Sequence, residues 1–197
     1  MTYEVLNSAE VYRGRRFALR RDEVVMPGGE PVVREVLVHP GAVVIAAVDD
    51  VDRIVLVRQY RHPIGRFQWE IPAGLLDVDG EPALAAARRE LAEETGVQAT
   101  EWHTLTDLAT SPGISSETVR VFLARGLSDV DDADRYVAHG DEEADMTVER
   151  IALDDAVKRV LAGELINAAT VAGVLAAARA RDDDWRGLRA ADAPWER

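Results

Sequence analysis

The segment Gly74–Val97 constrains the fold of this 197-residue chain more than any other part of the sequence. Its second half, Glu81–Thr95, predicts a helix, because Pro82 suits a first helical turn and Gly96 suits the left-handed position just after the last one. Apolar residues recur there at the spacing of a helix face that packs on a sheet: Leu84, Ala87 and Leu91. The segment therefore predicts a helix buried along one side.

The neighbouring face of this helix is acidic. Glu90, Glu93 and Glu94 stand at positions i, i+3 and i+4, so three carboxylates project together near the C-terminal end, where the helix dipole disfavours anions. Each unfavourable contact costs tenths of a kcal/mol to about 1 kcal/mol if solvated. A hard divalent cation with oxygen ligands, Mg²⁺ or Mn²⁺, would remove the repulsion. The alternative is an ordinary solvated acidic face, since charge runs usually face solvent.

Composition limits the classes of function open to the chain. It has 36 acidic and 23 basic side chains, a formal net charge of −13 and no cysteine. The lack of cysteine excludes zinc–thiolate sites, iron–sulfur clusters, disulfides and thiol nucleophiles. The negative charge argues against nucleic acid and anionic membranes as partners, since both need a basic surface. It leaves small phosphorylated substrates open, because a bound divalent cation inverts the local sign of charge.

No segment resembles a targeting signal or a membrane anchor. The start, Met1–Glu10, lacks basic residues followed by an apolar run. The longest apolar stretches, Gly41–Val48 and Ala168–Ala178, are far shorter than the roughly 20 residues of a spanning helix. We therefore expect a cytoplasmic protein.

Turns and apolar runs divide the chain into three regions. Residues 1–40 predict a small N-terminal antiparallel sheet, since Pro27-Gly28-Gly29 is a strong hairpin signal. Residues 41–180 predict the main domain, an α+β or mixed α/β sandwich. Residues 181–197 are a charged C-terminal segment, open to interpretation as a mobile tail or a partner contact. The predicted elements are strands at Phe17–Val25, Pro31–Val38, Gly41–Val48, Ile54–Tyr60, Thr118–Ala124 and Met146–Ala152, and helices at Asp154–Ala162 and Asn167–Ala180.

The acidic helix belongs to a longer motif. Gly74 and Glu81 open it, and Arg89–Val97, with the sequence RELAEETGV, completes a pattern that resembles the signature of the Nudix hydrolases. One departure is the six residues between Gly74 and Glu81, where the family pattern has five, which lengthens the loop but leaves the helix in register. The resemblance implies an α/β/α sandwich around a mixed sheet, and metal-dependent cleavage of a nucleoside diphosphate linked to another group.

The resemblance also implies roles for particular residues. Glu90 and Glu94 correspond to the principal metal ligands, with Glu93 assisting. Arg89 corresponds to a residue that orients a carboxylate, and the backbone carbonyl of Ala73 to a further ligand. The spacing of the side chains supports the glutamates, whereas the carbonyl rests on family analogy alone.

Features outside the signature resemble the ADP-ribose pyrophosphatase branch of the family. They are Pro112, which lies 15 residues beyond Val97, the stretches Gln59–Pro63 and Trp69–Gly74, and the N-terminal hairpin. This branch implies hydrolysis of ADP-ribose to AMP and ribose 5-phosphate by a homodimer that exchanges the N-terminal sheet. Alternatives are another diphosphate substrate (a nucleotide sugar, NADH or a nucleoside triphosphate) or a non-catalytic ADP-ribose sensor. Without the family context, Pro112 is equally well explained as part of a turn.

The same branch suggests substrate contacts. Arg61 corresponds to a diphosphate contact, since a guanidinium pairs well with phosphate oxygens, although a surface arginine is the alternative. Phe17 corresponds to a residue that stacks on adenine from the partner subunit, with Arg34 and Glu35 nearby; a core aromatic is the alternative. Further positions expected to bind substrate are Leu75, Ser111 and Glu117.

Hydrolysis also needs a base for the attacking water. The acidic run Gly140–Met146 matches a mobile loop that supplies a glutamate in this branch, and loops of this kind close over substrate. The resemblance implies Glu143 as the base, with Glu142 as the second choice. A solvated acidic loop is the alternative.

Overall fold

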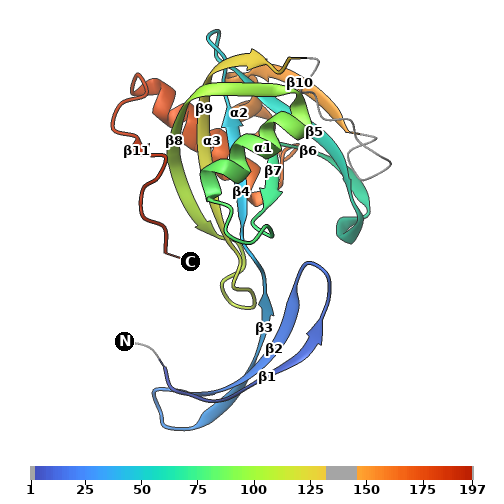
Figure 1. Ribbon diagram of the computed structural model, residues 1–197, viewed down its shortest axis with the longest axis vertical. Coiled ribbons are helices and arrows are strands. Elements are labelled where there is room, and N and C mark those ends of the chain that lie inside the picture. The colour runs from blue at the N-terminus through green and yellow to red at the C-terminus, as the bar shows by residue number, and fades with distance from the viewer. Residues whose placement is uncertain (1–2, 132–145, 197) are drawn as a thin grey trace.

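The computed structural model describes residues 3–131 and 146–196, which form a layered α/β body with a separate sheet at the N-terminus (Figure 1). The elements are β1 (Val5–Arg13), β2 (Ala18–Val25), β3 (Pro31–Val38), β4 (Ala42–Ala47), β5 (Arg53–Arg61), a 3₁₀ turn (His62–Ile64), β6 (Arg66–Glu70), β7 (Ala73–Leu75), α1 (Ala83–Thr95), β8 (Val97–Ala109), β9 (Thr118–Asp129), β10 (Thr147–Ala152), α2 (Leu153–Leu161), α3 (Ala168–Asp182) and β11 (Arg189–Ala190). No helix within these ranges combines the length and apolarity needed to cross a membrane.

The central sheet is mixed. Its strand order is β11-β8-β9-β4-β7, with β4 parallel to β9 and the other neighbours antiparallel. Every residue of β4 is buried, as its continuous apolar sequence predicts for a strand covered on both faces. The predicted α/β sandwich with a mixed sheet is confirmed.

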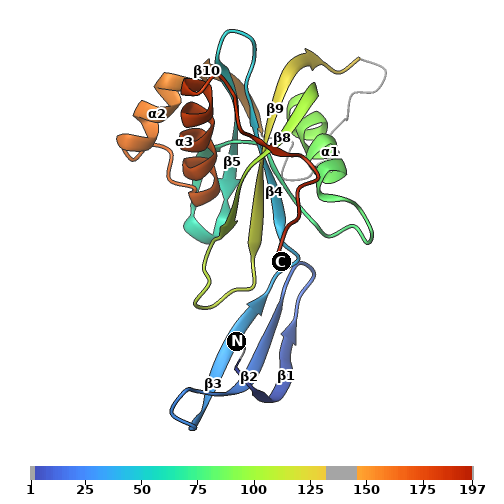
Figure 2. The ribbon, with the colours of Figure 1, turned by 90° about the vertical axis from the view of Figure 1, so that its left-hand side faces the viewer.

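Helices cover both faces of the body, with α1 on one side and α2 and α3 on the other (Figure 2). A second sheet, with the strand order β10-β5-β6, belongs to the same body. Two hydrophobic clusters form the core. One joins the sheet to α2 and α3 around Leu123 and Leu153, and the other lies under α1 around Leu91 and Phe122.

Helix α1 ends where the sequence predicts, after Thr95, but it begins at Ala83, two residues later than the predicted Glu81. Pro82 is the N-cap residue, and Gly96 ends the helix in the left-handed region with φ 66°, where its N–H donates to the carbonyl of Ala92 at 2.9 Å. A residue with a side chain would be strained at that φ, so the glycine fixes where the helix ends. Leu91 is fully buried, whereas Leu84 is only half-buried.

The N-terminal strands β1, β2 and β3 form an antiparallel sheet of their own, which projects from the body (Figure 2). Every residue of β1 is exposed. Leu37 links this sheet to the body, because its N–H donates to the carbonyl of Ile114 at 2.8 Å and its carbonyl accepts the N–H of Ser116 at 3.0 Å. The sheet therefore meets the body at the loop between β8 and β9.

The C-terminal segment packs on its own chain, a placement that neither the mobile-tail nor the partner-contact interpretation included. Its strand β11 pairs with β8, and buried Arg120 donates to the carbonyls of Ala193 and Pro194 at 2.6 and 3.0 Å. The Arg120 guanidinium also stacks on the ring of Trp195, 4.8 Å from its centroid. Arg120 pairs with Asp107 as well, and these contacts anchor the segment to the hairpin of β8 and β9.

Candidate active site

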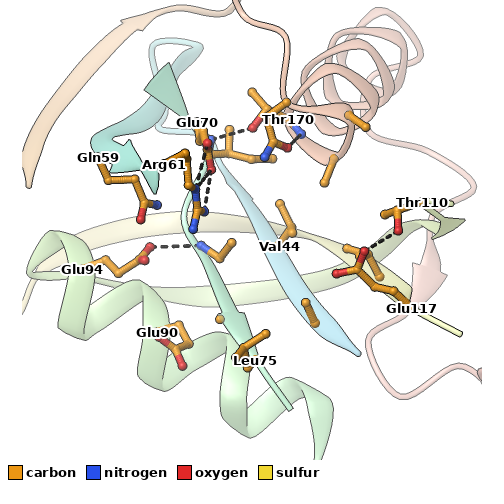
Figure 3. A pocket seen from close by; sticks show the side chains of 18 of the residues that line it. Val44, Gln59, Arg61, Glu70, Leu75, Glu90, Glu94, Thr110, Glu117 and Thr170 are labelled. Atoms are coloured by element: carbon orange, nitrogen blue, oxygen red, sulfur yellow. Dashed lines mark hydrogen bonds and ion pairs between the residues drawn. The ribbon is translucent and has the colours of Figure 1, made fainter. Parts of the chain in front are cut away.

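A cleft of about 770 Å³ lies between α1 and the start of α3, over the strands β4 to β7 (Figure 3). Two groups of side chains line its opposite sides. We call Arg89, Glu90, Glu93 and Glu94, all from α1, the helix wall. We call Gln59, Arg61, Glu70 and Thr170, which come from β5, β6 and α3, the sheet wall.

Arg89 organises the helix wall. Its Nε and Nη2 donate to the two carboxylate oxygens of Glu81 at 3.0 Å each, and its Nη1 donates to Glu90 at 2.7 Å and to Glu93 at 3.0 Å. The hydrogen bonds with Glu81 lower the pKa of that carboxyl and raise the pKa of the guanidinium above its ordinary value. One cation therefore holds three carboxylates and offsets the repulsion that the spacing of Glu90 and Glu93 implies.

The signature glycine allows the strand and the helix to approach closely. A Cβ on Gly74 would overlap the side chain of Glu90, so any larger residue would displace that carboxylate. Beside it, the N–H of Ala73 donates to Glu94 Oε2 at 3.0 Å. Strand β7 thus fixes one glutamate by a hydrogen bond and leaves room for the other.

The sheet wall is built around a buried carboxylate. Glu70 is 1% exposed and accepts from Arg61 through two nitrogens, Nη2 at 2.7 Å and Nε at 3.1 Å. This forked pair fixes the plane of the guanidinium. Thr170, buried at the start of α3, accepts the N–H of Ile71 at 3.1 Å and so ties the helix to the strand end.

Another part of the cleft is formed where the N-terminal sheet meets the β8–β9 loop. The Thr110 hydroxyl bonds to the Glu117 carboxylate, and His39 Nδ1 lies 3.5 Å from that carboxylate (Figure 3). His39 Nδ1 also accepts the N–H of Gly41 at 3.1 Å. This end of the cleft therefore joins residues that directly follow β3 and β8 and directly precede β9.

A divalent cation fits the cleft by donor chemistry. Glu90, Glu93, Glu94 and Ala73 line it and supply carboxylate and carbonyl oxygens, the donors that such ions prefer. Within residues 3–131 and 146–196, however, no three acidic or histidine groups already converge on one point. Glu90 bonds to Arg89 and Glu94 bonds to the Ala73 N–H, so cation binding would exchange these contacts.

The structure brings most of the expected site residues to one cleft. Those that line it are Phe17, Arg61, Ala73, Leu75, Arg89, Glu90, Glu93, Glu94 and Glu117. Arg34 and Glu35 are exposed on β3 and Ser111 is exposed in the β8–β9 loop, where its carbonyl accepts the N–H of Ser115 at 2.9 Å; none of the three lines this cleft. Phe17 lines the cleft of its own chain, whereas the expectation placed it over a partner's. Glu142 and Glu143 lie outside the described residues.

The cleft also contains polar residues for which the sequence predicts no role: Gln59, Glu70, Thr110, Asn167 and Thr170. Gln59 carries a weak signal, since it is a buried polar residue that follows an apolar run within β5. Thr170 carries none, because its position beside Ile71 depends on a contact across 99 residues of chain.

The fold and the helix wall define a class of metal-dependent diphosphate hydrolases, and comparison with known families agrees. A sequence model of the NUDIX domain matches residues 38–168, and the chain belongs to the Nudix hydrolase family. Nudix hydrolases generally use divalent metal ions.

Individual relatives are similar over most of the chain. An ADP-ribose pyrophosphatase from Mycobacterium tuberculosis is 53% identical over 174 residues, which cover 88% of this chain and 82% of the relative. An ADP-ribose pyrophosphatase from Bacillus subtilis is 38% identical over 82% of this chain and 84% of the relative. A solved structure described as an ADP compounds hydrolase aligns with a TM-score of 0.79 at 24% identity, over 94% of this chain and 97% of that chain. This last likeness concerns the fold.

Proposed function

We propose that the protein is an Mg²⁺-dependent hydrolase that cleaves ADP-ribose to AMP and ribose 5-phosphate. The observation that carries the proposal is the cleft itself, in which carboxylates from α1 and the Arg61 guanidinium line one cavity. A diphosphate needs cations or positive side chains on both sides, and this arrangement provides them. The extensive similarity to relatives named ADP-ribose pyrophosphatases supports the choice of substrate.

In this mechanism the chain's own residues position the reacting groups. Glu90, Glu94 and the Ala73 carbonyl would hold the metal, with Glu93 assisting. The bound metal supplies charge neutralisation of the diphosphate and a more acidic water. Arg89 keeps the glutamates on one face, and its contacts with Glu81 hold it there.

Arg61 presents its guanidinium to the phosphate oxygens, and Glu70 fixes the direction from which it does so. Phe17, 43% exposed and lining the cleft, offers a ring on which adenine can stack. Leu75 and Glu117 complete the substrate contacts of this chain. Glu143, or Glu142 as the second choice, is proposed as the base that accepts a proton from water.

We further propose a cytoplasmic homodimer. The N-terminal sheet exposes several large apolar side chains: Val5, Leu6, Val11, Tyr12 and Val33. A second copy would cover them, and an apolar surface of this kind is typical of association sites. In such a dimer, Arg34 and Glu35 would serve the partner's cleft, and Ser111 stays a predicted substrate contact on the β8–β9 loop. Sedimentation at micromolar concentration tests the dimer, and a monomer would contradict it.

Product analysis tests the function. Purified protein is incubated with Mg²⁺ and ADP-ribose, beside ADP-glucose, NADH and a nucleoside triphosphate. We expect AMP to form fastest from ADP-ribose and the reaction to stop with EDTA. Faster turnover of another compound would keep the Nudix chemistry and replace the substrate. Tight ADP-ribose binding without turnover of any compound would instead indicate a sensor.

A further inference from the structure

Gln59 is a largely buried polar side chain that has no hydrogen-bond partner among the residues that the structure describes. It lies in β5, is 6% exposed and lines the cleft. No hydrogen bond from the part of the chain that the structure describes reaches its carboxamide, and Figure 3 shows that group turned into the cavity. Because Gln59 lines the cleft, its amide is open to a ligand or a water there, which can make the hydrogen bonds that the described protein does not.

The other polar groups of the sheet wall already have protein partners. Arg61 is paired with Glu70, and Thr170 accepts the N–H of Ile71. The carboxamide of Gln59 therefore differs from its neighbours, because its donors are available to a ligand without breaking a contact of the protein.

Gln59 also shares a face with Arg61. Residues two apart on a strand point the same way, and both of these line the cleft. A group that Arg61 contacts is thus within reach of Gln59 as well. Figure 3 shows the Gln59 carboxamide beside Arg61, at the end of the cavity where Glu94 of the helix wall also lies. A neutral donor suits that place, because it adds hydrogen bonds without adding charge beside the Arg61–Glu70 pair and Glu94.

We infer that Gln59 is a substrate-binding residue whose carboxamide N–H donates to a phosphate oxygen of the diphosphate, beside Arg61. Phosphate oxygens only accept hydrogen bonds, and an amide N–H is a suitable donor to them. The inference rests on the proposed function, since it assigns Gln59 to the same reaction. Because binding precedes and persists through the bond cleavage, the contact acts on substrate affinity more than on the turnover rate.

The test replaces Gln59 with leucine, which has a similar shape and no polar atoms. We expect the KM for ADP-ribose and the inhibition constant of ADP to rise about tenfold or more together, because a hydrogen bond to a charged group is lost. ADP keeps the diphosphate and lacks the terminal ribose, so an unchanged ADP constant would overturn the assignment to the diphosphate. The turnover number should change by less than about threefold.

The melting temperature distinguishes a substrate-binding role of Gln59 from a structural one. Leucine removes an amide that has no protein partner, so the unliganded Q59L protein should melt at or above the temperature of the wild type. A melting temperature several degrees lower would indicate a structural role and overturn the inference. The matched control is Gln68→Leu, opposite Gln59 in the β5–β6 register and absent from the cleft lining, for which KM should not change.

A second variant and a separate readout keep the outcomes distinct. Gln59→Glu keeps the shape, loses both donors and adds a negative charge, so its effect on KM should exceed that of Q59L. Failure of the wild type to hydrolyse ADP-ribose would count against the proposed function alone. Calorimetric binding of ADP with Mg²⁺ would then still test Gln59, and equal affinities of the wild type and Q59L would refute its role.

Discussion

The two walls of the cleft differ in how much charge they carry and in how deeply that charge is buried. The helix wall concentrates charge: Arg89, whose side chain is 32% exposed, holds Glu90 and Glu93 of the wall and Glu81 outside it. The sheet wall carries one forked ion pair around a carboxylate that is 1% exposed. Partly exposed acids can exchange partners at lower cost than buried ones, whereas a buried pair strongly resists the loss of either member. The helix wall is thus suited to receiving a cation, and the sheet wall to holding a substrate in a fixed position.

The largest effect is expected on the helix wall, from Glu94→Gln. The amide oxygen of glutamine still accepts the Ala73 N–H, so the fold should survive. Loss of the charged ligand should lower the turnover number roughly 1,000-fold, since a bound metal contributes several kcal/mol to such reactions. Steady-state kinetics measure the turnover number. Glu101→Gln, which removes an exposed acid on β8, is the control. Unchanged activity of E94Q would refute the metal role of the helix.

A smaller effect is expected where β7 approaches the helix wall. Gly74→Ala would place a Cβ in the space of the Glu90 side chain, which must then rotate away. We expect kcat/KM to fall roughly 100-fold, because misplacing a catalytic group by about 1 Å has that effect. The melting temperature should change little. Gly28→Ala is the control, since a Cβ there meets no atom within 4 Å. A large loss of stability in G74A with little loss of activity would contradict this account.

The sheet wall predicts a different pattern for Arg61→Met. KM should rise roughly 30-fold through loss of a charged hydrogen bond to phosphate. The free energy of unfolding should also fall by about 2 kcal/mol, because Glu70 is left buried and unpaired, and the part exposure of Arg61 reduces the effect. Both effects are readable by kinetics and by denaturant unfolding.

A double variant separates these two effects. Adding Glu70→Gln to R61M removes the buried charge and should restore stability but leave KM high. Arg58→Met is the control on the same strand, because Arg58 stacks on Phe67 and does not line the cleft. A double variant as unstable as R61M would show that the ion pair does not account for the loss.

The difference between the walls also explains what the sequence could predict. The helix wall comes from one contiguous segment, so the spacing of its glutamates and of Gly74 is visible along the chain. The sheet wall joins β5, β6 and α3, and its contacts cross as many as 99 residues, so its partners depend on the fold. Strand β8 escaped prediction because its polar residues and the irregularity between Thr104 and Thr106 interrupt the alternation. The anchoring of the C-terminal segment by Arg120 depends on contacts 73 residues apart in the chain.

The smallest effect is expected away from both walls, at Asp107 in the β8–β9 hairpin. Burial alone would raise the pKa of Asp107, but hydrogen bonds from Arg120 and Arg189 outweigh it and hold the pKa below its ordinary value. The unfolded chain therefore takes up the proton first as pH falls, so the stabilisation is complete above about pH 4 and is lost as pH falls through the folded-state pKa.

Asp107→Asn should lower the free energy of unfolding by about 1 kcal/mol at pH 7 and by progressively less below pH 4. Thermal unfolding from pH 3 to 7 measures this, with exposed Asp129→Asn as the control. KM and kcat at pH 7 should not change, because Asp107 supports the hairpin without lining the cleft. A stability loss that stays constant down to pH 3 would show that the charge of Asp107 is not what stabilises the hairpin. A change in KM would show instead that Asp107 and its arginine partners help to position Thr110 and Glu117. The other end of the cleft would then depend on long-range contacts as the sheet wall does.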